Sequence, residues 1–225
     1  MVTTGLSGRD VVVFGATGAL GAGVASMFAS AGAAVVGADR AAPPPERTLT
    51  GISYEVVDAM DEEELAGLFD AHSPPWAVIN TIGAYAPARS LAELDAAELT
   101  RQLQLNLVTA ALITKHALRV MQPAGQGRIV HTASRAAVEP KGSGFAYSVS
   151  KQGVLHLVAM AAEEVRGTGI TVNCVVPSII DTPANRAAIP AADHDSWPKI
   201  PDVSLSYVYL ATPDAHLVNG AALPV

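Results

Sequence analysis

Short apolar runs alternate along the chain with longer stretches in which apolar residues recur at the spacing of a helix. The runs are rich in valine, isoleucine and alanine, which is typical of strands buried on both faces. Glycine and proline separate many of them from the stretches that follow. The pattern predicts seven strands, at residues 11–14, 34–38, 54–57, 76–80, 128–132, 170–175 and 221–223.

The longer stretches between these strands predict helices. Acidic residues fill the first turn of one stretch, at 61–71, where the helix dipole favours negative charge. Proline and glycine near 123–125, and glycines at 167 and 169, would end the two longest helices. The proline-rich segment 177–201 is expected to be an irregular loop. We expect helices at residues 20–31, 61–71, 95–121, 145–166 and 203–211.

The alternation of strands and helices predicts the fold class. Strands separated by helices favour right-handed crossovers, which place the strands in one parallel sheet with helices on both faces. No internal repeat, linker or block of like charge interrupts the pattern. We therefore expect an α/β protein with a Rossmann-type, doubly wound parallel sheet, built as a single domain over residues 1–225. The segment 177–201 would form its substrate loop.

The composition excludes several classes of protein. Half of the residues are hydrophobic and only 16% are charged, which excludes an intrinsically disordered chain. The net charge of −7 and the lack of a basic run argue against a protein that coats nucleic acid or anionic membrane. Cys174 is the single cysteine, so an intrachain disulfide and a cysteine-rich zinc cluster are excluded. The histidines lack metal-site spacing, and we expect no metal.

An uncharged stretch at residues 11–38 is long enough to suggest a membrane span. Its six glycines, three of them close together after a valine run, instead favour a buried strand, a turn and a helix. The first ten residues lack the basic region of a secretory signal. We expect a soluble, cytoplasmic protein that acts on a small-molecule substrate.

A glycine-rich turn, with Gly15, Gly18 and Gly21, joins the first predicted strand to the first predicted helix. Such a turn lets a pyrophosphate approach the N–H groups at the start of the helix, although a tight turn without a ligand would look similar. Asp39 ends the second strand, where an acid can bind the hydroxyls of the adenine ribose. Arg40 could hold a 2′-phosphate, but Asp39 would repel it. We therefore expect NAD(H) to be preferred, with NADP(H) possible.

Four polar residues could carry chemistry. Tyr147 and Lys151 are four residues apart and share one face of a predicted helix, and a nearby ammonium lowers the pKa of a phenol toward the working range of an acid or base. Ser134 follows the fifth strand, 13 residues before Tyr147, where its hydroxyl could bond a substrate oxygen. Asn106 lies within a long helix and is either a functional amide or a buried group bonded to the backbone.

These motifs, in this order, resemble the short-chain dehydrogenase/reductase family along nearly the whole chain, from Val11 to about Pro224. The resemblance implies that Tyr147 is the general acid/base and that Lys151 binds the nicotinamide ribose and lowers the pKa of the tyrosine. It implies that Ser134 orients the carbonyl and that Asn106 helps to hold a proton-relay water. The implied cofactor site comprises Gly15, Thr17, Gly18, Leu20, Gly21, Asp39, Arg40, Asp58, Asn80, Gly83, Tyr147, Lys151, Pro177, Ile180 and Thr182.

The chain departs from the usual family pattern in three motifs. The middle glycine of the turn is shifted to Gly18, residues 80–83 read Asn-Thr-Ile-Gly in place of Asn-Asn-Ala-Gly, and Ser178 replaces the glycine of a Pro-Gly pair. Segments at 18–21 and 181–197 are similar to quinonoid dihydropteridine reductases within the family. Those enzymes typically lack the serine that Ser134 provides here.

The leading interpretation is an NAD(P)-dependent oxidoreductase that transfers hydride between the cofactor and a carbonyl or alcohol carbon. The alternatives are a dihydropteridine-reductase-like enzyme with a quinonoid substrate, a non-redox enzyme of the same fold such as a dehydratase or isomerase, and a nucleotide-sensing regulator. Tyr85 and Trp197 are candidate substrate contacts, with Trp197 either a lid residue or a packing residue. The resemblance implies that the two long helices pair across a two-fold axis, giving a homodimer or homotetramer.

Overall fold

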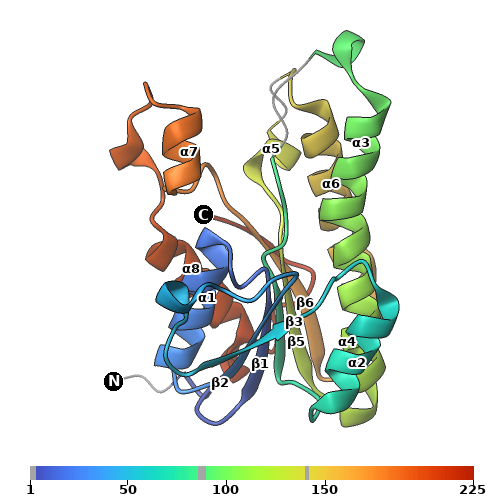
Figure 1. Ribbon diagram of the computed structural model, residues 1–225. Helices are drawn as coiled ribbons and strands as arrows, with labels where there is room; N and C mark the ends of the chain where they lie inside the picture. Colours follow the sequence, from blue (N-terminus) through green and yellow to red (C-terminus); the bar gives the residue numbers. More distant parts are fainter. Residues whose placement is uncertain (1–3, 86–89, 140–141) are drawn as a thin grey trace.

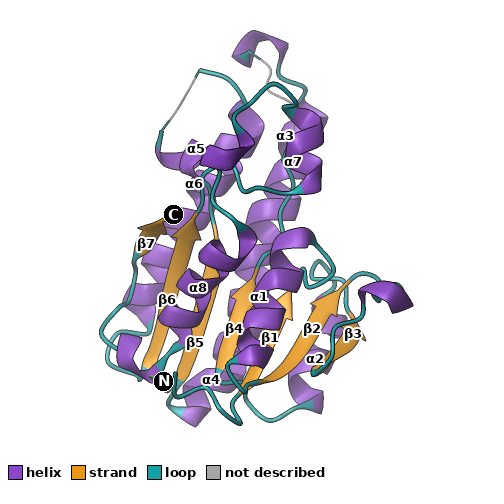
Figure 2. Ribbon diagram, turned by 90° about the vertical axis from the view of Figure 1, so that its left-hand side faces the viewer, coloured by secondary structure: helices purple, strands orange, loops and turns teal. Residues whose placement is uncertain are grey.

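A seven-stranded, wholly parallel sheet forms the centre of the molecule, with strand order β3-β2-β1-β4-β5-β6-β7 (Figure 2). The computed structural model describes residues 4–85, 90–139 and 142–225. The predicted α/β class and doubly wound sheet are confirmed. The strands are β1 (Asp10–Phe14), β2 (Ala34–Asp39), β3 (Ile52–Val56), β4 (Ala77–Asn80), β5 (Gly127–Thr132), β6 (Ile170–Val176) and β7 (Ala222–Pro224).

Helices cover both faces of this sheet, as Figure 1 shows. Buried residues of α1 and α8 form one apolar cluster on one face, and those of α2, α4 and α6 form a second cluster on the other. No helix among the described residues has the length and apolar character needed to cross a membrane. The helices are α1 (Ala19–Ser30), α2 (Glu62–Ala71), α3 (Ala96–Gln102), α4 (Thr109–Ala124), α5 (Arg135–Val138), α6 (Phe145–Glu164), α7 (Pro183–Ala188) and α8 (Ile200–Ala211).

Burial on both faces explains the continuous apolar runs in the sequence. Every residue of the central strands β4, β5 and β6 is buried, including the polar residues at the carboxyl ends of β4 and β5. Because all the strands are parallel, their carboxyl ends meet at one edge of the sheet. That edge receives the glycine turn after β1, the segment after β4 and the serine after β5.

The helix predicted at 95–121 is one helical path with an internal change of pitch. It comprises α3, a π-helical segment at Leu103–Val108 and α4, which continues to Ala124 with Pro123 inside its last turn. Gly125 then adopts φ +65° and ends the helix, as its position in the sequence indicated. The π-helical segment contains the buried Asn106.

The prediction of an irregular loop over 177–201 is wrong in part. Thr182 caps α7 by accepting a hydrogen bond from the N–H of Asn185, and Pro183 occupies the first helical position. A 3₁₀ turn follows at His194–Ser196, and α8 begins at Ile200 rather than at 203. The short helix α5, capped by the Ser134 hydroxyl, was also not expected.

Two glycines between α6 and β6 share one backbone conformation but differ in their surroundings. Gly167 and Gly169 both have φ +82°, a region that side chains rarely adopt. A Cβ atom at Gly167 would meet nothing within 4 Å, whereas one at Gly169 would lie 2.4 Å from the carbonyl oxygen of Gly125. Gly169 therefore lets the turns before β5 and β6 approach each other closely.

This pair gives a matched test of close approach. Gly167→Ala should cost only the strain of positive φ, about 1 kcal/mol of unfolding free energy. Gly169→Ala should cost more, because the same strain is joined by a clash with backbone that cannot move aside like a flexible side chain. Urea denaturation of both variants would measure the two losses. Equal losses would contradict the close approach of Gly169 to Gly125.

Candidate active site

A cavity of about 200 Å³ opens at the carboxyl edge of the sheet, between the ends of the central strands and the start of α7. Its walls combine side chains from segments that are far apart in sequence. The lining residues are Leu20, Thr81, Gly83, Ala84, Tyr85, Thr132, Ala133, Ser134, Tyr147, Lys151, Pro177, Ser178, Ile180 and Asn185. Eight of the residues predicted from the sequence therefore meet in this cavity: Leu20, Gly83, Tyr85, Ser134, Tyr147, Lys151, Pro177 and Ile180.

Ser134 reaches the cavity because β5 ends two residues earlier. Its extended backbone and its side chain form the N-cap of α5, where Oγ accepts a hydrogen bond from the N–H of Ala136 at 3.2 Å. The segment before it is anchored to the next strand, since the N–H of Ala133 donates to the Val175 carbonyl. The hydroxyl is thus held on a rigid strand end, facing the cavity.

Tyr147 lies in the first turn of α6, with its ring edge-on to Tyr85 at 5.3 Å between centroids. Burial raises the pKa of the Tyr147 phenol, a hydrogen-bonding contact with Ser134 lowers it, and Tyr85 raises it. The pKa was expected to be lowered by Lys151. The structure corrects this direction, because burial outweighs the contact with Ser134 and Lys151 directs its own hydrogen bond elsewhere. The phenol is therefore protonated at neutral pH.

Lys151 lies one turn further along α6 and is only 3% exposed. Its Nζ donates to the carbonyl oxygen of Thr132 at 2.9 Å, at the end of β5. Burial lowers the pKa of the ammonium from 10.5 to about 8. At neutral pH Lys151 is therefore a buried cation with two of its three N–H donors still available beneath the cavity.

Asn106 is fully buried and bonded on every side. Its Oδ1 accepts from the N–H of Ala84, and its Nδ2 lies within hydrogen-bond distance of the Ala84 carbonyl, Gln102 Oε1 and Ser150 Oγ. Asn106 thus holds the segment after β4 against α6, next to Lys151, and lies behind the cavity wall. A Cβ atom at Gly83 would lie 2.7 Å from Lys151 Nζ and 2.9 Å from Asn106 Oδ1, so a side chain here would displace both groups.

The glycine turn is shaped to receive a negatively charged group. Gly18 is exposed, and a Cβ atom there would meet only the Gly15 carbonyl, at 3.3 Å, so the space above it is open. The first turn of α1 contains no acid, and no side chain caps its N–H groups. Gly21 has no such space, because its Cβ would lie 2.1 Å from the Gly15 carbonyl oxygen. These features fit the pyrophosphate of a dinucleotide.

Asp39 binds this turn to the end of β2. Its Oδ2 accepts hydrogen bonds from the N–H and the hydroxyl of Thr17, at 3.0 and 2.6 Å, and its Oδ1 accepts from the N–H of Arg40 at 2.8 Å. The Arg40 side chain is exposed beside it. Asp58 follows β3, where its Oδ1 accepts from the N–H of Met60. These residues surround the place where the sequence predicts the adenosine half of the cofactor.

Asn80 has a structural role below the site. Its Oδ1 accepts from the N–H of Ile82, which turns its Nδ2 toward His131 Nδ1 at 3.2 Å. His131 Nε2 is 2.8 Å from the Thr114 hydroxyl, and burial lowers the pKa of His131 to about 3, so the ring is neutral. Asn80 is 2% exposed and does not line the cavity, so it shapes the end of the strand and not the cavity wall.

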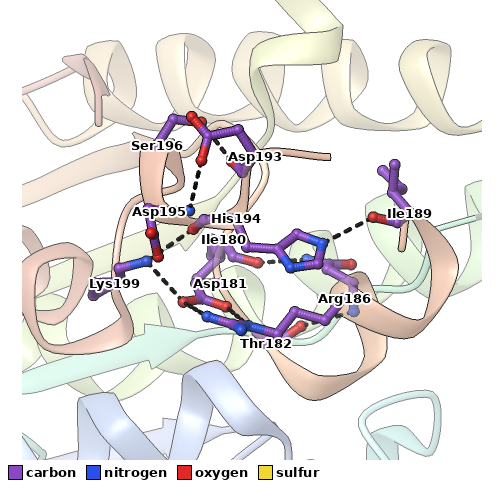
Figure 3. A network of polar contacts seen from close by, with 11 residues as sticks. Ile180, Asp181, Thr182, Arg186, Ile189, Asp193, His194, Asp195, Ser196 and Lys199 are labelled. Carbon is purple, nitrogen blue, oxygen red and sulfur yellow. Dashed lines mark hydrogen bonds and ion pairs between the residues drawn. The ribbon is translucent and has the colours of Figure 1, made fainter. Parts of the chain in front are cut away.

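An ion-pair network joins the two ends of the segment between β6 and α8 (Figure 3). The Asp181 carboxylate accepts two hydrogen bonds from Arg186, at 2.5 and 2.8 Å, and one from Lys199 at 2.8 Å. Both cations lower the pKa of Asp181. The N–H of Asp181 also donates to the Pro198 carbonyl, and Lys199 donates to the His194 carbonyl. The base of the segment between β6 and α8 is therefore closed by its own residues.

Trp197 does not contact the cavity, which corrects its prediction as a possible lid residue. It is buried, its ring lies 4.6 Å from that of His194, and it is not among the residues that line the cavity. Asn185 takes a place in the wall that sequence reasoning missed. Its Nδ2 donates to the Ile180 carbonyl at 2.8 Å, which leaves Oδ1 as an acceptor in the cavity wall. Nothing in the sequence marked Asn185 for a place in the cavity wall, because it is an amide in a short helix within a proline-rich segment.

The family model described as short chain dehydrogenase matches residues 9–193. The chain is 33% identical to a cis-4-hydroxycyclohexanecarboxylate dehydrogenase of Sinomonas cyclohexanicum, over 96% of this chain and 94% of that protein. It is 27% identical to a D-threitol dehydrogenase of Mycolicibacterium smegmatis, over 98% and 92% of the two chains. A solved structure from Beutenbergia cavernae, assigned as an NAD(P)-dependent gluconate 5-dehydrogenase and containing NADP, superposes with a TM-score of 0.88 at 26% identity, covering 99% and 96%.

The described residues contain no group of three or more His, Cys, Asp and Glu side chains that could hold a metal ion. The similarity to quinonoid dihydropteridine reductases is not supported by the relatives named above and stays a prediction.

Burial of the Lys151 charge predicts a pH-dependent effect on stability. Below pH 8 the lysine is charged in both the folded and the unfolded chain. Burying this charge costs about 3 kcal/mol of unfolding free energy, which corresponds to the lowering of the lysine pKa from 10.5 to about 8. Between pH 8 and 10.5 the folded protein has released this proton and the unfolded chain has not, so the wild type gains stability as the pH rises.

Lys151→Met removes the titrating group and keeps most of the volume. The unfolding free energy of the variant relative to wild type should therefore be highest near pH 7 and fall steadily to pH 10.5. Chemical denaturation across this range, with exposed Lys115→Met as the control, would measure the trend. A difference between Lys151→Met and wild type that does not change with pH would contradict the lowered pKa.

Proposed function

Because the chain belongs to the short-chain dehydrogenase family, we propose that it transfers a hydride between a nicotinamide cofactor and a carbonyl or alcohol carbon of a small substrate. The observation that carries this proposal is the convergence of Ser134, Tyr147 and Lys151 on one cavity beside the glycine turn. A binding-only protein would not need a buried phenol and a buried cation under a small-molecule pocket.

Tyr147 acts as the proton donor when a carbonyl is reduced. When bound, a nicotinamide cofactor would supply the hydride, and the carbonyl oxygen of the substrate would then need a proton. The phenol is protonated at neutral pH because burial raises its pKa, so it is in the state required for donation. Ser134 can hydrogen-bond the same oxygen and hold it near the phenol. Alcohol oxidation reverses these roles, and Tyr147 then accepts the proton.

Lys151 supports both the cofactor and the phenol. Its bond to the Thr132 carbonyl fixes the ammonium under the cavity, and its two remaining N–H donors can bind ribose hydroxyls near the nicotinamide. A positive charge in this position also stabilises the tyrosinate once the proton has left. Asn106 contributes by holding Ala84 and Ser150, which fixes the wall around Lys151.

The pyrophosphate of the cofactor would bind over Gly18, and the adenosine half would lie beside Asp39. Asp39 can still accept from ribose hydroxyls and would repel a 2′-phosphate, which supports NAD(H) as the preferred cofactor with NADP(H) as a weaker one. The nicotinamide half would lie among Leu20, Pro177 and Ile180, the apolar part of the cavity wall.

The substrate class that we propose is a small alcohol or ketone. Two relatives are named as dehydrogenases of a hydroxycyclohexane carboxylate and of D-threitol, and both are small hydroxylated compounds. The cavity wall supplies an acceptor at Asn185 and hydroxyls at Ser134 and Ser178, which can bond additional hydroxyl groups. A cytoplasmic location stays a prediction from composition.

We also propose that the chain assembles as a homodimer or homotetramer. Val108, Phe145, Val149 and Met160 leave apolar side chains exposed along the outer sides of the π-helical segment and α6. Pairing these helices with those of a second copy would bury this surface. Light scattering at micromolar concentration should give at least twice the monomer mass, and Met160→Glu should shift the protein toward monomer. A monomeric wild type would contradict the proposal.

Tyr147→Phe tests the acid/base role directly. The substitution removes the transferable proton and keeps the ring, so kcat should fall by at least about 10²-fold. The affinity for NADH should change by less than about twofold, because the phenol is not a main cofactor contact. Nicotinamide absorbance with a panel of small alcohols and ketones gives the first value, and NADH fluorescence gives the second. Full activity in Tyr147→Phe would reject the mechanism.

Ser134→Ala, measured in the same assay, separates the substrate classes. A ketone needs its oxygen oriented, so kcat should fall severely if the substrate is a simple carbonyl. A quinonoid pterin can be protonated at nitrogen without this hydroxyl, and the loss should then be mild. Activity without any exchange of hydride would instead favour a dehydratase or isomerase.

A further inference from the structure

Gln102 is a polar side chain that is completely enclosed by the protein, and no motif of the sequence marked it. It is the last residue of α3, directly before the π-helical segment, and its exposed fraction is 0%. At this point the helical path packs against α6 (Figure 1). Burying an amide costs free energy unless its N–H and C=O groups find partners, so the partners of Gln102 indicate its role.

A chain of hydrogen bonds runs through this amide from the surface to Asn106. Gln102 Nε2 donates to Glu98 Oε1 at 3.0 Å, and Gln102 Oε1 accepts from Asn106 Nδ2 at 2.8 Å. Glu98 is half-buried and is itself bound by Arg101, at 2.8 and 2.9 Å. Residues 98, 102 and 106 follow one another at intervals of four, so they stack along one face of the helical path.

The carboxylate at the outer end fixes the direction of this chain. A carboxylate only accepts hydrogen bonds, so Glu98 selects the NH₂ group of Gln102 and turns the Gln102 oxygen inward. That oxygen selects the NH₂ group of Asn106, and Asn106 Oδ1 then accepts from the N–H of Ala84 at 3.2 Å. Hydrogen bonds aligned in this way polarise one another, which strengthens the chain as a whole.

Asn106 depends on Gln102 because its other acceptors are farther away. Asn106 Nδ2 carries two hydrogens and has three acceptors within reach. Gln102 Oε1 is the nearest at 2.8 Å, followed by Ser150 Oγ at 3.0 Å and the Ala84 carbonyl at 3.3 Å. Without the Gln102 oxygen, the buried amide of Asn106 would lose its shortest bond and move toward the other two acceptors.

Two parts of the cavity wall depend on where Asn106 lies. Ala84 lines the cavity, and Tyr85, which follows it, lies edge-on to the ring of Tyr147 at 5.3 Å. On the other side, Ser150 Oγ accepts from Asn106 and donates to the Tyr147 carbonyl at 2.7 Å. Asn106 is therefore held between the segment after β4 and the first turn of α6, and it joins the two.

We propose that Gln102 is a positioning residue for the reaction, which fixes Asn106 and thereby sets the spacing between the wall at Ala84 and the phenol of Tyr147. The inference rests on the proposed function, because it assigns the proton transfer to Tyr147. Gln102 does not line the cavity, so it acts through Asn106. Small displacements of a catalytic group from its substrate slow the reaction strongly, which makes such support important.

Gln102→Met and Gln104→Met form a matched pair of variants. Both replace a glutamine by an apolar side chain of similar size, but Gln104 is exposed on the π-helical segment. Nicotinamide absorbance with one active substrate gives kcat, and fluorescence titration gives the affinity for NADH. Hydrogen exchange of the Ala84 N–H, followed by NMR, reports the position of Asn106 without any need for activity.

Gln102→Met should lower kcat about tenfold, because the reacting groups are no longer held at one spacing. The affinity for NADH should change by less than about twofold, since the glycine turn and Asp39 belong to other segments. The Ala84 N–H should exchange at least about tenfold faster, because its acceptor is no longer fixed. Gln104→Met should leave all three values unchanged.

Gln102→Glu tests whether the acceptor is what matters. At about pH 6 a buried carboxyl group beside Glu98 holds a proton, so it can donate to Glu98 and accept from Asn106 as the amide does. Its kcat should therefore lie within about threefold of the wild-type value. A kcat as low as that of Gln102→Met would contradict the inference, because the acceptor would then have no effect.

Two further results would overturn the inference: an unchanged kcat in Gln102→Met, or an unchanged exchange rate of the Ala84 N–H. If Gln102→Met does not fold, Glu98→Met tests the chain from its outer end and should lower kcat about threefold. An unchanged kcat in Glu98→Met would then reject the inference. A wild type without hydride transfer would reject the proposed function alone, and faster exchange at Ala84 in Gln102→Met would still support the positioning of Asn106.

Discussion

The active site depends on one buried positive charge. Lys151 is nearly inaccessible to water, and the group that accepts its hydrogen bond is a backbone carbonyl, that of Thr132. The titratable groups around it stay neutral: burial keeps His131 unprotonated and keeps the Cys174 thiol and the Tyr207 phenol protonated. A carboxylate in this cluster would neutralise the ammonium. The groups that surround Lys151 are uncharged instead, so the positive charge of its ammonium remains available to a ligand bound above it.

This arrangement fixes the geometry of the rest of the site. The bond between Lys151 and Thr132 joins α6 to the end of β5, and Tyr147 lies one turn earlier on the same helix. Ser134 lies two residues beyond Thr132 on the same chain segment. This contact between a helix and a strand end, together with the bond from the Ser148 hydroxyl on α6 to the Ala136 carbonyl on α5, sets the relative positions of the phenol, the hydroxyl and the ammonium.

Local patterns predicted the sheet and much of the site. The valine-rich runs marked β1 and β6 because full burial leaves no polar alternation, and the spacing of Tyr147 and Lys151 on one helix face placed both at the cavity. Contacts that depend on how loops and turns fold could not be predicted from local patterns. Arg47 reaches Thr17 through the fold of a proline turn, and Trp197 packs on His194 because the loop closes on itself. The helix α7 is too short for periodicity to reveal, although its cap, Thr182, and Pro183 stood in the sequence.

The segment between β6 and α8 is closed at its base by contacts between its two ends. Asp181 and Lys199 meet across 18 residues of sequence, so the chain between them leaves the body of the protein and returns to it at one fixed point. Arg186 and the His194 carbonyl, which lie inside that span, also hold the two ends, whereas Asn185 is the residue of the span that lines the cavity. Recombination or laboratory grafting that keeps these anchoring contacts would exchange α7 and the wall at Asn185, and would leave Ser134, Tyr147 and Lys151 in place.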